Sequence, residues 1–552
     1  MLSKIKKILR FLDTHLLTIL TGILIVIIPL YPKLPLADLI EGYIVRLRLE
    51  DIAIFLALVI WGIQILRKKI IFPKTKIAKL ILIYLAFATL SAIAAVLVTK
   101  TVPLERAHLQ KLALHLFRRF EYFSLFFIAY SGVKTKRDLK VFIYTILFTF
   151  IAAVGYGFGQ KYLYWPAFST MNREFSKGVR LYLSPTSRVM STFGGHYDYA
   201  AYLMMLLSAL VSVVWLVKSK VWFILFSLLF LGAYWSLILT ASRTSFAGYL
   251  VGITAIFYCF AKIKGFKWSV RRWLVTMTVS FSIMIFFGDL SERFYQLVQS
   301  PAAIQKFVPW METGKIEEKI YEVKDFFYAL EAWKNNLANP PLPPPPENSI
   351  SMDELSRVAV SSDIPPSATK PLPPDVTKEE EEIRERVASE SAGANQTPEV
   401  GGYSENALKY GLSLAIRLDA LWPRAIEGFM RNPLLGSGFS TLTKSTTEEF
   451  TSAESTDNDY LRMLGETGLL GTLSFLAILF VLMRISYQGF KRTTSIFKQV
   501  LYLGSIGAIA GLLVNATYID VFESSKIAYT LWIIAALVVR SLELDHKDEK
   551  QT

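Results

Sequence analysis

The sequence predicts an all-α polytopic membrane protein with about twelve transmembrane helices. Of the 552 residues, 53% are hydrophobic and 14% are aromatic. A soluble domain of this length rarely carries so much apolar surface, and here the apolar residues are clustered in blocks. A helix needs about 17–25 largely apolar residues to cross a bilayer, and most of these blocks reach that length.

Twelve apolar blocks define the expected order of helices along the chain. The first follows SKIKKILR and lacks a small-residue cleavage site, so we expect a retained helix and not a removed signal. The blocks lie at 12–31, 52–66, 77–98, 112–132, 139–160, 199–217, 221–240, 244–261, 273–288, 466–483, 499–516 and 526–540.

Lysine and arginine are concentrated in alternate connections between these blocks, and those connections contain a single acid, Asp138. This bias is typical of cytoplasmic loops. It places both termini on the cytoplasmic side of the membrane, and it explains the net charge of +15 without a nucleic-acid partner. The basic connections are 1–10, 67–79, 133–140, 218–220, 262–272 and 484–498.

The chain is expected to divide into three parts. Residues 1–288 would hold helices one to nine, 289–465 a large extracytoplasmic loop, and 466–552 helices ten to twelve with a cytoplasmic tail. Within the loop, residues about 337–402 are rich in proline and acids and poor in large apolar residues, which predicts a disordered insert. The spacing at 407–430 predicts a helix that lies on a surface.

Three arginines at the expected outer membrane edge run against the positive-inside bias: Arg188, Arg243 and Arg417. Ionisable groups at membrane depth are costly and usually functional. Three guanidiniums around one outer cavity would suit a phosphate or pyrophosphate, because the planar fork binds its oxygens bidentately. Two alternatives remain open: Arg243 could extend to lipid phosphates, and Arg188 could serve solubility alone.

The stretch STDNDYLRMLGETGLLG, residues 455–471, places Asp457 at the mouth of the tenth predicted helix. Counted from Asp457, helical spacing puts Gly468 and Gly471 on the same small, apolar face. We therefore expect the Asp457 carboxylate on the packed side, directed into the outer cavity. The alternative is that residues 455–458 cap the helix, since an acid is favoured near a helix start.

A second row of polar residues lies on another face of the same predicted helix. Asp459, Arg462 and Glu466 are spaced by three and four positions, which predicts a row of mutually compensating ion pairs.

Nothing in the sequence predicts a metal or an organic cofactor. The single cysteine, Cys259, lies in an apolar block, so no disulfide is expected. The five histidines show no metal-ligand spacing, and no phosphate-binding or dinucleotide-binding glycine motif is present.

Four stretches occur in a characteristic order: RVMSTFGGHYDYAAYL, TASRTSFAGYL, RLDALWPRAIEGFMRNPLLGSG and NDYLRMLGETGLLG. With these stretches, and with a large outer loop between helices nine and ten, the chain resembles the O-antigen ligase and O-antigen polymerase superfamily of bacterial membrane glycosyltransferases. The resemblance covers most of the chain outside the insert. It implies metal-independent transfer of a glycan from an undecaprenyl-pyrophosphate carrier to a glycan or lipid acceptor, at the outer face of the cytoplasmic membrane.

The resemblance also implies roles for individual residues. Family arginines that hold the pyrophosphate leaving group correspond to Arg188 and Arg243. Ligases of the family carry a histidine before an asparagine and two spaced glycines, and here Asp457 stands in the histidine position. We expect Asp457 to act as general base, and the replacement leaves ligase and polymerase activities both open. The residues expected to contact substrate are Arg417, His196 and Asn458.

Two other classes of protein fit the same topology. A transporter or flippase can have twelve helices with both ends inside, although no internal six-helix repeat is visible. A non-catalytic scaffold of polysaccharide assembly could use the insert as a tether.

Overall fold

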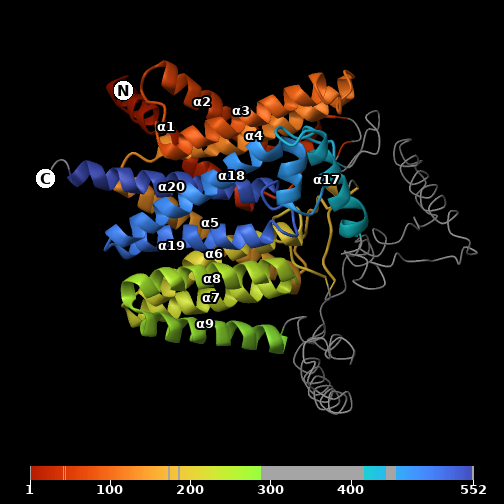
Figure 1. The fold of residues 1–552 in the computed structure, drawn as a ribbon. Coiled ribbons are helices and arrows are strands. Elements are labelled where there is room, and N and C mark those ends of the chain that lie inside the picture. The colour runs from red at the N-terminus through yellow and green to blue at the C-terminus, as the bar shows by residue number, and fades with distance from the viewer. Residues whose placement is uncertain are drawn as a thin grey trace, which may run out of the picture.

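Helices dominate the part of the chain that the structure describes. The computed structural model describes residues 2–40, 43, 45–171, 174–184, 187–287, 416–442 and 455–549. The long helices run side by side, and the start of α1 lies at the same end of the bundle as the end of α20 (Figure 1). We call this the near end and the opposite one the far end.

The helices follow the predicted order, and each of the twelve apolar blocks coincides with one long helix. The first nine are α1 (Leu2–Leu30), α2 (Leu49–Leu66), α3 (Lys76–Leu97), α4 (Arg106–Gly132), α5 (Lys136–Tyr162), α6 (His196–Leu216), α7 (Lys220–Leu239), α8 (Arg243–Lys264) and α9 (Phe266–Phe287). The chain resumes with a π-helical turn, Arg417–Leu421, followed by α17 (Trp422–Arg431), α18 (Asp459–Arg492), α19 (Ile496–Asn515) and α20 (Ser525–Glu549).

Ten of the described helices are long and apolar enough to cross a membrane, so the chain is a multi-pass membrane protein. The helix α4 is not among the ten, because Arg118, Arg119 and Glu121 interrupt its apolar stretch. The block predicted at 273–288 extends beyond the described part of α9. The total of twelve spans, the orientation and the identity of the membrane therefore stay predictions.

Two predictions for the large loop fall wholly or partly outside the described residues. The insert at about 337–402 lies outside them, as does the first part of the helix predicted at 407–430. The remainder of that helix is the π-helical turn and α17, which packs against α18. Its described part is therefore held by another helix.

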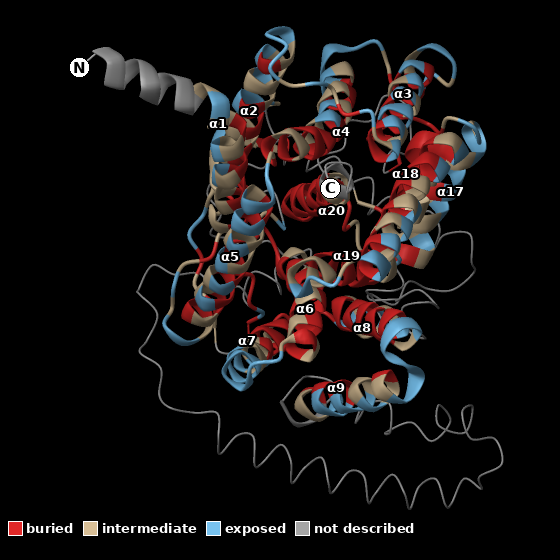
Figure 2. Ribbon diagram, turned by 90° about the vertical axis from the view of Figure 1, so that its left-hand side faces the viewer, coloured by how far each residue is buried: buried red, intermediate tan, exposed pale blue. Residues whose placement is uncertain are grey.

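The most enclosed helices are α20 and α6, in which 83% and 78% of the apolar window is buried. Viewed from the near end, α20 lies inside a ring of other helices, which expose their outer faces (Figure 2). Within this arrangement α20 packs on α4, α18 on α3, and α19 on both α6 and α8. Mutual packing thus fixes the far-end termini of α4, α18, α19 and α20 relative to one another.

Small residues allow α8 and α19 to approach closely. A Cβ added at Gly248 would lie 2.7 Å from the carbonyl oxygen of Gly511, and one at Gly252 would lie 2.6 Å from that of Gly507. Such glycine pairs let membrane helices bring their backbones together and gain van der Waals contact. The contact fixes the far-end start of α8, and with it Arg243, against the end of α19.

The only strands among the described residues form a short hairpin at the far end. Strand β1 (Pro35–Asp38) pairs antiparallel with β2 (Arg46–Arg48), and Arg46 pairs with Asp38 at 2.6 Å. The hairpin joins α1 to α2. It brings Arg48, the residue immediately before α2, to the end of the bundle where α4 begins.

Candidate functional site: a cationic cavity at the far end

A polar cavity of about 320 Å³ opens at the far end of the bundle. Its charged wall combines five basic residues with three acidic residues, so basic side chains outnumber acidic ones on the lining itself. Elements distant in the sequence meet here: the end of α1, the hairpin, the first half of α4, the start of α6, and the connection between α19 and α20. The charged wall residues are Lys33, Arg48, Arg118, Arg119, Arg462, Asp198, Asp520 and Glu523.

Two of the arginines are neutralised by a buried network of acids. Arg119 lies 2.5 Å from Glu523 and 3.6 Å from Glu466. Arg462 lies 2.8 Å from Asp520 and 3.4 Å from the same Glu466. Because each cation has two acids beside it, this network is a structural element of the cavity wall.

Two further cations on the wall have one acid each. Lys33 donates a hydrogen bond to Glu50 at 2.9 Å, and both side chains are buried. Burial is the largest effect on Lys33 and lowers its pKa, although Glu50 opposes the change. Arg118 lies 3.6 Å from Asp51, a longer and weaker contact.

Arg48 differs from these four cations because, among the described residues, no acid lies within ion-pair distance of it. Its side chain is 7% exposed and lines the cavity, and its Nε has no hydrogen-bond partner among the described residues. Burial is the largest effect on Arg48 and lowers its pKa, as does the neighbouring Arg118, while the acids Glu50 and Asp51 oppose the change. A buried guanidinium without its full set of acceptors is costly, and an anionic ligand would supply them.

The connection between α19 and α20, residues 516–524, joins most parts of the site. The carboxylate of Asp520 accepts hydrogen bonds from the hydroxyl of Ser455 at 3.0 Å and from the backbone N–H groups of Thr456 and Asn458 at 3.0 and 2.9 Å. Since Asp520 also pairs with Arg462, one carboxylate holds the turn before α18 and one wall of the cavity.

Asp457 occupies a different position from the predicted one. It precedes α18, and its φ of 50° is left-handed, so it does not share a helical face with Gly468 and Gly471. Its carboxylate pairs with Arg417 at 2.8 Å and accepts a hydrogen bond from Ser455, also at 2.8 Å. Ser455 lines the cavity, so Asp457 is connected to the cavity wall through its hydrogen bond with Ser455.

The effects on the Asp457 carboxyl oppose one another. Burial is the largest, and it raises the pKa of Asp457 above its ordinary value. Arg417 lowers the pKa, and the nearby Asp520 raises it again. A carboxylate whose pKa is shifted towards neutrality is a better proton acceptor at physiological pH than an exposed one.

Asn458, the last residue of the stretch 455–458 that was expected as an alternative to cap the helix, is the N-cap of α18. Its side-chain oxygen accepts the backbone N–H of Leu461 at 3.0 Å, and its amide nitrogen donates to the carbonyl of Thr517 at 3.1 Å. Both ends of the Asn458 amide are therefore already engaged by protein groups. Its predicted contact with substrate stays a prediction.

The predicted ion-pair row on α18 is only partly correct. Arg462 does pair with Glu466, but its shortest contact is with Asp520 on another element. Asp459 accepts the backbone N–H of Phe522 at 3.0 Å, and it is buried. The prediction of ion pairs within α18 alone is incomplete, because helix spacing gives no information about partners from the α19–α20 connection.

Arg188 and His196 are brought together at the start of α6. Nη1 of Arg188 lies 3.1 Å from Nε2 of His196, the geometry of a hydrogen bond to a neutral imidazole. Arg188 is exposed, whereas His196 is 5% exposed. Asp198, two residues further on in α6, lines the cavity, but positions two apart on a helix do not share a face, and neither Arg188 nor His196 lines the cavity.

Arg243 is the first residue of α8, and it is exposed. Its segment lies next to that of Arg188, because Val189 donates its N–H to the carbonyl of Leu239 at 3.1 Å. Among the described residues, neither arginine is part of the cavity wall. Both lie at the far end, Arg188 shortly before the start of α6 and Arg243 at the start of α8.

Arg417 is buried, in contrast to Arg188 and Arg243. Its guanidinium carbon lies 4.0 Å from the ring centre of Tyr518, and it pairs with Asp457. Tyr518 belongs to the α19–α20 connection, so Arg417 fixes the π-helical turn against that connection. None of the three predicted arginines lines the cationic cavity: Arg188 and Arg243 are exposed, and Arg417 is buried beside Asp457.

The glycine motif in α18 marks a break in the helix. Gly468 has φ 63° and ψ −165°, a conformation that is essentially limited to glycine. The backbone N–H groups of Leu469 and Leu470 donate to the carbonyls of Pro433 and Leu434 at 2.9 and 3.2 Å. The NPLLGSG stretch thus replaces the missing helical hydrogen bonds, and the break serves to lock α17 and α18 together.

Sequence reasoning missed the cations that line the cavity. One signal was available: Arg118 and Arg119 lie inside the predicted span 112–132, where charges are rare and mostly functional. Lys33 and Arg48 carried no such signal. They lie in a connection between helices, and only the hairpin brings them to α4.

Comparison with known proteins leaves the site to be interpreted from its own geometry. No family model matches this sequence, and no curated protein is significantly similar to it. The fold and the site together define a multi-pass membrane protein with a cationic cavity at one end of its helical bundle.

Proposed function

We propose that this protein transfers a glycan from an undecaprenyl-pyrophosphate carrier to an acceptor hydroxyl at the outer face of the cytoplasmic membrane, as a ligase or a polymerase of surface polysaccharide. The observation that carries the proposal concerns Arg48, whose buried guanidinium lies on the wall of the cationic cavity. Its Nε has no hydrogen-bond partner among the described residues. A pyrophosphate presents oxygens that suit this guanidinium and its neighbours Lys33 and Arg118.

The chemistry requires a leaving group to be stabilised and a proton to be removed. The acceptor oxygen attacks the anomeric carbon of the donor, and the bond from that carbon to the pyrophosphate oxygen breaks. The carrier leaves as undecaprenyl pyrophosphate, whose added negative charge the cavity cations stabilise in the transition state. The hydroxyl proton passes to a carboxylate, for which we propose Asp457 at the cavity edge.

Arg188 and Arg243 have a complementary role in this proposal. Both are exposed on adjacent segments at the far end, where they can contact the pyrophosphate of a carrier that enters from the membrane. Replacement of either by lysine keeps the charge but loses the planar fork. We expect a loss of about 1–3 kcal/mol of transition-state binding, or roughly ten- to two-hundred-fold in rate.

A transporter or flippase is the second candidate, and the break at Gly468 is the observation that favours it, because transporters bind substrates at discontinuous helices. In such sites the freed backbone groups point at the substrate. Here the donors of Leu469 and Leu470 are occupied by the carbonyls of Pro433 and Leu434. Because these donors are not free to bind a substrate, the break at Gly468 does not favour transport over glycan transfer.

Reconstituted protein tests the proposal. Vesicles containing the purified chain receive a lipid-linked glycan donor and an acceptor glycan, and the elongated or ligated product is measured. We expect product with the parent protein and a loss of about ten- to a hundred-fold with Arg48→Gln. Arg106→Gln is the matched control, since Arg106 is exposed at the start of α4 and does not line the cavity. Movement of the donor across the vesicle membrane without product would support the flippase instead.

A further inference from the structure

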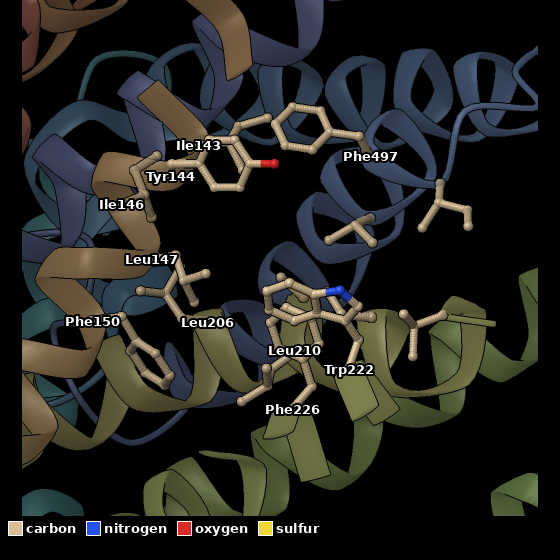
Figure 3. Close-up of a pocket in the computed structure, with 15 residues that line it drawn as sticks. Ile143, Tyr144, Ile146, Leu147, Phe150, Leu206, Leu210, Trp222, Phe226 and Phe497 are labelled. Atoms are coloured by element: carbon tan, nitrogen blue, oxygen red, sulfur yellow. The ribbon is translucent and has the colours of Figure 1, made fainter. Parts of the chain in front are cut away.

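A second cavity of about 380 Å³ lies towards the near end of the bundle, opposite the cationic one. Its walls come from α5, α6, α7 and the start of α19, and their side chains converge on a common space (Figure 3). The walls are almost wholly aliphatic and aromatic. Leu147 and Phe150 from α5 face Leu206 and Leu210 from α6, with Phe226 from α7 nearby.

Two amphipathic aromatic residues lie in this cavity wall. Tyr144 is 61% exposed and Trp222 is 54% exposed, and the Tyr144 ring contacts Phe497 at 5.6 Å between centroids. Tyrosine and tryptophan are enriched where a membrane meets water, because one end of each ring system is polar. Their positions mark the side of the cavity that faces the headgroup region at the near end.

Lysines accompany the aromatic residues. Lys140 lies one helical turn before Tyr144 on α5, and Lys218 and Lys220 flank the α6–α7 connection between the wall residues Val217 and Trp222. All three lysines are exposed, and the described residues give none of them an ion pair. Lys498, next to Phe497, differs because it pairs with Asp545 and is already neutralised.

We infer that this cavity binds an acyl chain of an anionic phospholipid from the leaflet at the near end, with the headgroup phosphate on Lys140, Lys218 and Lys220. Apolar walls offer nothing to orient a soluble ligand, whereas basic pockets between membrane helices bind anionic lipid headgroups. The volume of about 380 Å³ lies at the small end of the range for ligand pockets, which suits a single chain.

The inference is independent of the glycan-transfer proposal. The helix α5 has 27 residues and is therefore about 40 Å long, and the wall residues 143–150 lie in its near-end half. The cationic cavity lies at the other end of the bundle. A lipid bound here would be a structural or regulatory ligand and not the glycan donor.

Tryptophan quenching by brominated lipid tests the inference. The full chain is reconstituted in zwitterionic phosphatidylcholine that contains equal small fractions of either chain-brominated phosphatidylglycerol or chain-brominated phosphatidylcholine. The Trp222 contribution is obtained by subtracting the signal of Trp222→Phe. We expect the phosphatidylglycerol to quench that contribution at a mole fraction at least about fivefold lower, because each lysine near a membrane surface strengthens the binding of an anionic lipid by about fivefold.

Variants separate specific binding from ordinary lipid contact. The triple variant Lys140→Gln, Lys218→Gln, Lys220→Gln should remove the preference, and Val213→Phe, which fills the cavity, should reduce quenching by both lipids. The matched control Lys264→Gln with Lys267→Gln removes two near-end cations on helices outside the cavity wall and should leave the preference intact. Equal quenching by the two lipids in the parent protein would overturn the inference. Relief of quenching by low concentrations of undecaprenyl phosphate, and not by unbrominated phosphatidylglycerol, would also overturn it, in favour of an isoprenoid occupant.

Discussion

The carboxylate of Asp457 lies 2.8 Å from the guanidinium of Arg417, which joins the turn before α18 to the π-helical turn before α17. The two residues were predicted to contribute separately to a site at the outer membrane edge. In the fold they form one unit, and Ser455 connects that unit to the cationic cavity. An acid in this position can act as a base or serve only as half of an ion pair.

Replacement of Asp457 by asparagine distinguishes the two roles. The substitution keeps the N-cap, because Asn458 provides it, and it removes only the charge and the basicity. General bases contribute about 10²–10⁴-fold, so we expect glycan transfer to fall by that factor while the protein stays folded, with some loss of stability because the buried Arg417 loses the charge of its partner. Asp457→His should retain activity, since imidazole titrates near neutral pH. Transfer by Asp457→Asn within a few-fold of the parent protein would assign Asp457 to the ion pair alone.

The pH dependence of transfer should shift when Arg417 is replaced. A base must be deprotonated to work, so activity is lost as the pH falls through its pKa. Burial raises the pKa of Asp457 and Arg417 lowers it, so Arg417→Gln should raise the pKa further. We therefore expect the acidic limb of the rate profile to move to higher pH. The exposed control Arg431→Gln should leave the limb in place, and an unmoved limb in Arg417→Gln would mean that another group titrates.

Gly468 should tolerate no side chain. Its backbone conformation is one that only glycine adopts readily, and an added Cβ would lie 2.4 Å from the carbonyl of Leu434. We expect Gly468→Ala to cost about 3 kcal/mol or more of stability, seen as early thermal unfolding in detergent.

Gly232 provides the matched comparison for that substitution. It lies within α7, and an added Cβ would have no atom within 4 Å. Gly232→Ala should be neutral or stabilising by up to about 1 kcal/mol, because alanine is the better helix former. Equal behaviour of the two variants would contradict the assigned break in α18.

Asp520 should be more important for stability than any exposed acid at the far end. Its carboxylate pairs with Arg462 and accepts two backbone N–H groups from the turn before α18. Asp520→Asn leaves the buried Arg462 with less compensation, so we expect a loss of about 2–4 kcal/mol in unfolding experiments. Glu427→Gln, which breaks an exposed ion pair with Arg431, should cost under about 1 kcal/mol. A similar loss of stability in both variants would show that the contacts of Asp520 with Arg462 and the turn before α18 are not specially stabilising.

The positions of the membrane helices were predictable because the length of an apolar block is a local property of the sequence. The contacts that form the site are not local. Asp520 meets the turn before α18 across about sixty positions, and Arg48 reaches Arg118 only through the hairpin after α1. The break at Gly468 was missed for a related reason: glycine also fits a smooth packed face, and only the carbonyls of residues 433–434 show that the helix is interrupted.

Direct binding of the carrier tests the central claim, that the cationic cavity holds the pyrophosphate of a lipid-linked donor. The dissociation constant of undecaprenyl pyrophosphate is measured for the parent protein, for Arg48→Gln and for the control Arg106→Gln in the same detergent. A hydrogen bond to a charged group is worth about 1.5–3 kcal/mol, so Arg48→Gln should weaken binding by roughly ten- to a hundred-fold while the control binds as the parent does. Equal affinities of the parent protein and Arg48→Gln would contradict the account and place the pyrophosphate outside this cavity.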